Sequence, residues 1–234
     1  MKVKIKNKKF VAKDTLRVEF ELEKNIFFRA GQHSSITIED IEFEDPRGNM
    51  RLFSFVNPPF DNKHYIITTR LRGSGFKEAL KNLPDGSTVD MGGVGGDLVL
   101  PDDKSQPLVF IAGGIGITPF MSMLSHIFEN NLPYKITLFY SNRDRESTPY
   151  FDEIEKWASK HENFDVMFLM TKDDTWKRER GHIDGNVISE YIDDINGSQY
   201  FVVGPPKMVK SVEQELLNVG IDEEQILRES FGGY

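Results

Sequence analysis

The sequence predicts a two-domain protein in which an antiparallel β-barrel or sandwich precedes a doubly wound parallel α/β domain. Three observations support this prediction. A chain of 234 residues is long for a single core. Short alternating segments fill it up to about residue 100, and continuous apolar runs alternate with helical patterns from about residue 108. The polar segment 101–107 joins the two halves, so we place the domains at 1–101 and 102–234.

The N-terminal half has the pattern of a small antiparallel sheet. Lysines alternate with Val3 and Ile5 over the first nine residues, as on a strand with one face in water. One helix is predicted at 75–83. The other segments are β-branched or aromatic and are separated by turn residues, which predicts strands at 16–22, 33–39, 51–56, 65–71 and 87–93.

The C-terminal half has the pattern of a parallel sheet covered by helices. Apolar residues recur at helical spacing over 117–128 and again over 209–219. Between these helices lie nearly continuous apolar runs, which are typical of strands buried on both faces: 108–112, 135–140, 165–170 and 199–203.

Composition excludes several classes of protein. The chain has no cysteine, so it holds no disulfide, no Cys-zinc site and no thiolate-bound iron–sulfur cluster. The net charge of −8 argues against nucleic-acid binding. The five histidines are scattered without ligand spacing, and we predict no metal site. The N-terminus lacks the apolar region of a signal peptide and no run is long enough to span a membrane, so we expect a cytoplasmic protein.

The segment "IAGGIGITPF" at 111–120 has the features of a nucleotide-binding turn. A dinucleotide fingerprint counted from Gly114 needs a glycine where Pro119 stands. Proline suits the first position of a helix, and Thr118 is then predicted as its N-cap. Gly114 and Gly116 would let a phosphate approach the backbone, although glycines that serve only packing fit the pattern as well.

Two further segments lie at the same predicted edge of the sheet. "GPPKM" at 204–208 follows the fourth strand of this half and opens a second helix that starts with proline. "YSNRDR" at 140–145 follows the second strand, where an NAD site usually carries an acidic residue. The arginines there are compatible with a 2′-phosphate, and equally with solvated loop charges.

"RLFS" at 51–54 is the candidate site of the first half. By strand alternation Arg51 and Phe53 share one face, and Ser54 lies on the other unless the strand bends. The pattern is short, and taken alone it is also that of an ordinary half-buried strand.

Taken together, these motifs make the whole chain resemble the ferredoxin–NADP reductase superfamily. Six short motifs match in the family's order: "AGQ" (30–32), "RLFS" (51–54), "GSGFKEAL" (73–80), "GGIGITPF" (113–120), "GPPKM" (204–208) and "ESFGGY" (229–234). The resemblance implies a Greek-key flavin-binding barrel at 1–101 and an NAD(P)-binding α/β domain at 102–234.

The resemblance also implies roles for individual residues. Arg51 would neutralise the FAD pyrophosphate, Phe53 would stack on the flavin ring, and Ser54 would hydrogen-bond near the ring nitrogen that accepts hydride. Phe53 stands where many members have tyrosine. Other implied flavin contacts are Leu52, Thr68, Thr69, Arg70, Gly75, Phe76 and Lys77.

The implied nicotinamide site lies in the second half. Glu229 would lie near the nicotinamide, and Phe231 or Tyr234 would cover the flavin, so with Ser54 these are the candidate catalytic residues. Val203 replaces a cysteine that many members have. The implied nucleotide contacts are Gly114, Gly116, Thr118, Pro119, Ser141, Arg143, Gly204, Pro205 and Met208.

The resemblance implies an FAD-dependent oxidoreductase that takes hydride from NADPH or NADH and passes electrons to a separate acceptor. That acceptor would be ferredoxin, flavodoxin, an oxygenase component or a small molecule. Two alternatives stay open: a flavin reductase that uses free flavin as substrate, and a non-catalytic flavin- or nucleotide-binding subunit of a larger complex. We expect no nucleic-acid partner, and a monomer is compatible with the sequence.

Overall fold

A computed structural model describes residues 1–39 and 44–232 and contains the two kinds of sheet that the sequence predicts. The chain forms two compact units. The first comprises Met1–Leu100 and Thr118–Glu129 and holds an antiparallel sheet, and the second comprises the remaining residues and holds a parallel sheet. The predicted fold class is therefore confirmed. The boundary between residues 101 and 102 stays a prediction.

The sheet of the first unit has the strand order β4-β3-β6-β1-β2-β5, and every pair is antiparallel. The Tyr65 hydroxyl, on β5, donates to the carbonyl of Phe53, on β4, over 2.6 Å. This bond links the two outer strands, as expected for a sheet that curls toward a barrel. The strands are β1 (Lys2–Ala12), β2 (Thr15–Leu22), β3 (His33–Thr37), β4 (Met50–Ser54), β5 (His64–Arg70) and β6 (Thr88–Met91).

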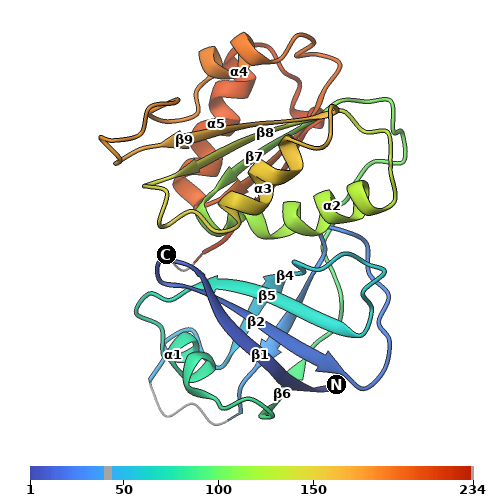
Figure 1. The fold of residues 1–234 in the computed structure, drawn as a ribbon, viewed down its shortest axis with the longest axis vertical. Helices are drawn as coiled ribbons and strands as arrows, with labels where there is room; N and C mark the ends of the chain where they lie inside the picture. Colours follow the sequence, from blue (N-terminus) through green and yellow to red (C-terminus); the bar gives the residue numbers. More distant parts are fainter. Residues whose placement is uncertain (40–43, 233–234) are drawn as a thin grey trace. The chain divides into compact units, whose positions relative to one another are not determined.

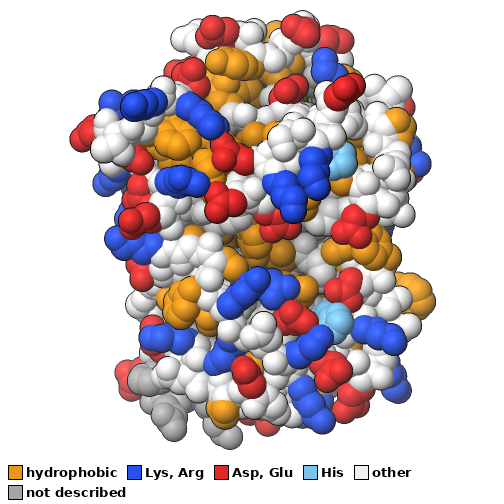
Figure 2. Space-filling model, in the orientation of Figure 1, with side chains coloured by type: hydrophobic (Ala, Val, Ile, Leu, Met, Phe, Trp, Pro, Cys, Tyr) orange, Lys and Arg blue, Asp and Glu red, His pale blue; other side chains and the backbone are white. Residues whose placement is uncertain are grey.

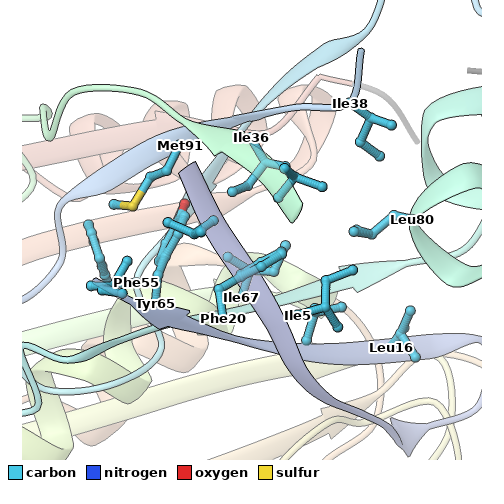
Figure 3. Close-up of a cluster of buried hydrophobic side chains, with 14 of the residues drawn as sticks. Ile5, Leu16, Phe20, Ile36, Ile38, Phe55, Tyr65, Ile67, Leu80 and Met91 are labelled. Carbon is cyan, nitrogen blue, oxygen red and sulfur yellow. The ribbon is translucent and has the colours of Figure 1, made fainter. Parts of the chain in front are cut away.

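Alternate side chains of most of these strands point to one side and form the core of the first unit, whereas β5 is buried at every position from Tyr65 to Arg70. In Figure 3, Phe20, Tyr65 and Ile67 lie together with Ile5 beside them, and Leu80 reaches the cluster from a helix. These side chains are at most 1% exposed. The period-two pattern in the sequence therefore separates the buried face of the sheet from its wet face.

Among the residues that the structure describes, two helices belong to the first unit. Helix α1 (Gly75–Asn82) starts at the N-cap Ser74, whose hydroxyl accepts the amide hydrogen bond of Lys77. Helix α2 (Thr118–Glu129) is held to the loop after β4, because the Ser122 hydroxyl donates to the Asn57 carbonyl over 2.7 Å. Both helices were predicted from the sequence, α2 from its apolar spacing.

The second unit is a parallel sheet with the strand order β11-β10-β7-β8-β9. Its strands are β7 (Leu108–Gly113), β8 (Ile136–Asn142), β9 (Phe164–Met170), β10 (Gln199–Gly204) and β11 (Ile226–Ser230). The four predicted strands are present. The edge strand β11 was not predicted from periodicity, because one short alternating stretch after a helix gives little pattern.

Helices lie on both faces of this sheet, as Figure 1 shows for α3 on one side and α5 on the other. Val209, Val212 and Leu216 of α5 (Pro206–Asn218) pack with α4 (Gly185–Tyr191) against one face. Phe151 of α3 (Phe151–Ala158) packs on Phe168 of the other face, with ring centroids 4.3 Å apart. Two 3-10 turns complete the unit, η1 (Gly114–Ile117) and η2 (Glu223–Gln225).

The surface carries charges of both signs. On the face drawn in Figure 2, basic and acidic side chains are intermixed without a large area of one sign. Across residues 1–39 and 44–232, no helix is long and apolar enough to cross a membrane. Over the same residues, no three side chains of histidine, aspartate or glutamate gather in the way a metal ion requires.

Candidate functional site

The parallel sheet places two predicted nucleotide-binding motifs side by side. Strand β7 pairs with β8 on one side and with β10 on the other, so the strand order reverses between β7 and β10. Ligands of open α/β sheets bind beyond the carboxyl ends of the strands at such a reversal. The glycine turn after β7 and the turn "GPP" after β10 both lie at this edge.

The glycines of these turns permit a close approach of backbone segments. A Cβ on Gly116 would lie 2.2 Å from the Val203 carbonyl oxygen, at the end of β10. A Cβ on Gly113 would lie 2.1 Å from the Met208 sulfur of α5. Gly114 has φ +55°, which favours glycine. Packing against backbone therefore requires glycine at position 116, and leaves amides of the turn near the sheet edge.

The expectation that Thr118 is an N-cap is wrong. The chain enters the 3-10 turn η1 at Gly114 directly from β7, and α2 continues from it with Thr118 as its first residue. The helical backbone therefore begins at Gly114, five residues before the predicted first helical residue, Pro119. Pro119 still lies in the first turn of α2, where its missing amide costs little. The carbonyl of Gly114 accepts a hydrogen bond from the Tyr140 hydroxyl over 2.9 Å.

The turn after β10 has the predicted proline start. Pro205 is the N-cap of α5 and Pro206 its first residue, and the cap makes no side-chain hydrogen bond. The amides of the first turn of α5 therefore lack a capping side chain. Together with the helix dipole, this is a suitable arrangement for an anion.

The end of β8 supplies polar groups to the same sheet edge. Within the part of the chain that the structure describes, both side-chain amide atoms of Asn142 are buried without a hydrogen-bond partner. Ser141 precedes it in the strand, and Arg143 follows with an exposed side chain. Arg145 is engaged elsewhere, because it pairs with Asp152 over 2.9 Å and lies over the Phe151 ring. Of the two arginines, Arg143 is therefore the better candidate for a 2′-phosphate contact.

Glu229 lies on β11 opposite Val203 of β10, which places it at the same end of the sheet. Burial raises the pKa of its carboxyl from the ordinary value of 4.5 to about 7. Phe231 follows β11, and its amide donates to the Gly204 carbonyl over 3.0 Å. Tyr234 lies outside the described residues.

Stability is expected to reflect this raised pKa. The unfolded chain ionises Glu229 above 4.5 while the native protein keeps its proton until about pH 7. The free energy of unfolding therefore falls as pH rises between these values and levels off above them. Glu229→Gln is expected to reduce that fall in urea unfolding at pH 5, 6, 7 and 8. The exposed Glu224→Gln is the control, and an equal change in both variants would contradict the assignment.

The first unit assembles the residues of "RLFS" on the outer strand β4. Arg51 and Phe53 share one face, and the Phe76 ring of α1 contacts both. The Arg51 guanidinium carbon lies 5.2 Å from the centre of that ring. Leu52 points the other way and is 61% exposed. The Ser54 hydroxyl is buried and makes no hydrogen bond to any residue that the structure describes.

A buried ion pair lies between β4 and the start of α1. The Arg51 side chain is 8% exposed, and its Nη2 lies 2.6 Å from Oδ1 of Asp45, whose side chain is 4% exposed. The other carboxylate oxygen accepts hydrogen bonds from the Ser74 hydroxyl over 2.7 Å and from the Phe76 amide over 3.0 Å. The hydrogen bond from the Phe76 amide holds the pKa of Asp45 well below its ordinary value. Smaller contributions come from the Ser74 hydroxyl, the Arg47 amide and the positive charge of Arg51.

More positive charges surround this pair. Lys77 follows Phe76 in α1, and burial lowers its pKa from 10.5 to about 8. The next causes, in order, are the positive charges of Arg47, Arg51, Arg72 and Arg70. Arg70 is buried at the end of β5, after the buried Thr68 and Thr69. The anion site, as we name this cluster of Arg51, Ser74, Phe76 and Lys77, therefore lies in a region of high positive potential.

Comparison with known proteins shows what this chain is similar to. Residues 110–214 match the family described as oxidoreductase NAD-binding domain. The reductase component of phenol 2-monooxygenase from Pseudomonas sp. (strain CF600) is 26% identical over 219 residues, which are 92% of this chain and 60% of the relative. The chain thus spans less than two thirds of that relative.

Two solved structures have the same fold over nearly the whole of both chains. A ferredoxin NADP+ reductase from Neisseria gonorrhoeae with bound FAD and NADP has a TM-score of 0.82 at 19% identity, and covers 98% of each chain. The FAD/NAD binding domain of a Vibrio cholerae nitric oxide dioxygenase has a TM-score of 0.85 at 17% identity, with 99% and 98% covered. The chain therefore has the two-domain fold of these FAD- and NAD(P)-binding reductases.

The structure adds one residue that the motifs did not indicate. Asp45 precedes "RLFS" by several residues and lies in none of the six motifs. Its only local signal is a turn composition, "DPRGN", which predicts a loop and not a buried carboxylate. The contact with α1 joins segments 29 and 31 residues apart, so only the tertiary structure reveals it.

Proposed function

We propose that the protein is an FAD-dependent oxidoreductase that takes hydride from NADPH or NADH and passes electrons to a separate acceptor. The observation that carries the proposal is the anion site in the first unit, where a buried arginine, a helix start and further cations converge. A pyrophosphate needs such a group of donors and positive charges.

The residues around this site fit FAD. Phe53 offers an apolar ring beside Arg51 on the outer strand, which suits stacking of a flavin ring. The Ser54 hydroxyl, buried and unpaired among the described residues, is a donor available to a ring nitrogen. The buried Thr68 and Thr69 on β5 are proposed to line the ribityl side. Gly75 and Lys77 would contribute backbone amides at the start of α1.

The second unit is proposed to bind the nicotinamide nucleotide at the reversal of strand order. Its pyrophosphate would meet the turns after β7 and β10, where Gly116 and Pro205 lie. The ribose side would meet Ser141 and Arg143, and Glu229 would lie near the nicotinamide. FAD, when bound, supplies the hydride acceptor and can release electrons singly or in pairs.

The relatives support this reading of the activity. The Pseudomonas relative is the reductase component of a monooxygenase, and the Neisseria structure holds both FAD and NADP. We therefore propose an oxygenase component or a small electron-transfer protein as the acceptor, with no nucleic-acid partner. The cytoplasmic location stays a prediction from the sequence.

An absorption spectrum of the purified protein, followed by anaerobic titration with NADH and NADPH, tests the proposal. We expect a bound flavin that either nucleotide bleaches. A colourless protein that reduces added flavin would identify a flavin reductase that uses flavin as substrate. A protein that binds the nucleotide and reduces no flavin would be a non-catalytic subunit, and the proposal would fail.

Arg143→Ala is expected to raise the KM for NADPH about tenfold and to leave the KM for NADH within about twofold, because only NADPH carries a 2′-phosphate. Steady-state kinetics with both nucleotides measures this. Arg145→Ala is the control, since that arginine pairs with Asp152. Equal effects of Arg143→Ala on both nucleotides would leave Arg143 as an ordinary loop charge.

A further inference from the structure

The Arg51 guanidinium already makes hydrogen bonds through Nη1 and an ion pair through Nη2 within its own chain. Its Nη1 donates to the carbonyls of Arg47, Gly48 and Met50 over 2.7–2.9 Å. Its Nη2 lies 2.6 Å from the Asp45 carboxylate. In this conformation the charged fork of Arg51 is directed at its own chain. A phosphate can reach Nη2 only after the Asp45 carboxylate has left it.

Asp45 occupies the site in the manner of a bound oxyanion. Oδ1 faces Arg51 Nη2 and accepts the Arg47 amide over 3.0 Å, while Oδ2 accepts from Ser74 and Phe76. Oδ2 thus has two hydrogen-bond donors at the start of helix α1, and Oδ1 has one amide donor and the Arg51 ion pair. These are the donor types that bind phosphate oxygens: a guanidinium, a hydroxyl and backbone amides at a helix start.

The charge balance favours a larger anion. Arg47, Arg51, Arg70 and Arg72 all lie close enough to affect Lys77 electrostatically. Against these positive charges, the Asp45 carboxylate supplies a single negative charge. A flavin pyrophosphate brings two negative charges, so it neutralises this region better than the carboxylate does. The two anions cannot share the donors, because like charges this close repel each other.

We propose that the Asp45 carboxylate is an internal occupant of the anion site, which the FAD pyrophosphate displaces, and that Asp45 thereby sets the affinity for FAD. The inference rests on the proposed function, since it names what the cofactor must replace. Flavin uptake then exchanges one set of ion pairs for another, and the free energy of the Asp45 contacts opposes binding. The loop that carries Asp45, residues 44–49, is released when FAD binds.

Asp45→Asn tests the exchange by two measurements: the Tm with and without FAD, and the Kd for FAD. Because the carboxylate contacts exist only without FAD, the variant is expected to lower the Tm of the flavin-free protein and to leave the Tm of the FAD-saturated protein unchanged. Its Kd for FAD, from flavin fluorescence quenching, is expected to fall about tenfold, as for the loss of one or two charge-assisted hydrogen bonds. The Kd for inorganic pyrophosphate is expected to fall in parallel.

Glu44→Gln is the matched control, because it removes the same charge from the neighbouring exposed side chain. It is expected to leave both Tm values and the Kd unchanged. An independent measurement needs no variant: FAD is expected to speed tryptic cleavage after Arg47 in the wild-type protein at least twofold. This readout holds even if Asp45→Asn does not fold.

The outcomes separate this inference from the proposed function. If wild type and Glu44→Gln bind FAD while Asp45→Asn binds it equally or more weakly, Asp45 supports the site in both states and the exchange is overturned. Protection of Arg47 by FAD would overturn it as well. If none of the three proteins binds FAD or pyrophosphate, the proposed function itself fails. If Asp45→Asn is the one protein of the three that binds FAD tightly, the result supports both the exchange and the proposed function.

Discussion

Arg51→Ala, made in the Asp45→Asn background, is expected to weaken FAD binding about 100-fold relative to Asp45→Asn alone. Arg51 is the buried cation of the anion site, and it approaches the carboxylate position at 2.6 Å. Removing the guanidinium leaves a pyrophosphate with helix amides and more distant cations only. Flavin fluorescence quenching measures the Kd, and the flavin content of the purified protein gives a second value.

The double background is needed because the single variant has a second effect. Arg51→Ala alone leaves the 4%-exposed Asp45 carboxylate without its ion-pair partner. A carboxylate that loses its ion-pair partner in such a place destabilises the folded protein. Loss of FAD in that variant would not distinguish binding from unfolding.

Arg17→Ala is the control for Arg51. Arg17 pairs with Glu19 within β2 over 3.2 Å and is 16% exposed. The substitution therefore removes a partly buried arginine of the same unit. Its Kd for FAD is expected to match the wild type. Full retention of stoichiometric FAD by the Arg51 double variant would show that the pyrophosphate binds elsewhere.

Gly116→Ala is expected to lower the free energy of unfolding by about 3 kcal/mol or more, since the added methyl group meets backbone and not a flexible side chain. The new Cβ would lie 2.2 Å from the Val203 carbonyl oxygen and 2.6 Å from its carbon. Relief requires the turn after β7 to move away from the end of β10. That movement separates the two turns proposed to hold the nucleotide.

Thermal unfolding followed by circular dichroism checks this expectation, and a decrease in Tm of about 6–12 °C corresponds to the predicted loss. Gly93→Ala is the control, because a Cβ there meets nothing within 4 Å and its φ is not positive. A Gly116 variant as stable as the control, with unchanged NADPH affinity, would contradict the close approach.

The sequence predicted the regular elements well where the pattern was long. The strands of the barrel and four of the five parallel strands were expected within a few residues, because alternation and continuous apolar runs are local signals. Helices α3 and α4, each of eight residues or fewer, were not expected. They give too few turns for a helical stripe to stand out, and α3 begins at a tyrosine with φ +62° and not at a capping side chain.

Within the candidate site, motifs predicted positions better than local geometry. "RLFS" lies on a strand and "GPPKM" follows the β10 strand at the sheet edge, as expected. Thr118 was assigned as a cap because threonine before proline is a common helix start. Instead, the 3-10 turn at Gly114–Ile117 leads directly into α2. A strand that runs into three glycines can turn immediately, without a capping residue.

By itself the sequence determined the two kinds of sheet, the order of the motifs and the superfamily that they resemble. These depend on periodicity and on short patterns, which a chain carries locally. Only the tertiary structure decided that Asp45 lies on Arg51 at the start of α1, and that Gly116 lies against Val203. Both contacts join segments far apart in sequence, and their distances depend on how the strands between them pack. No local pattern records such a distance.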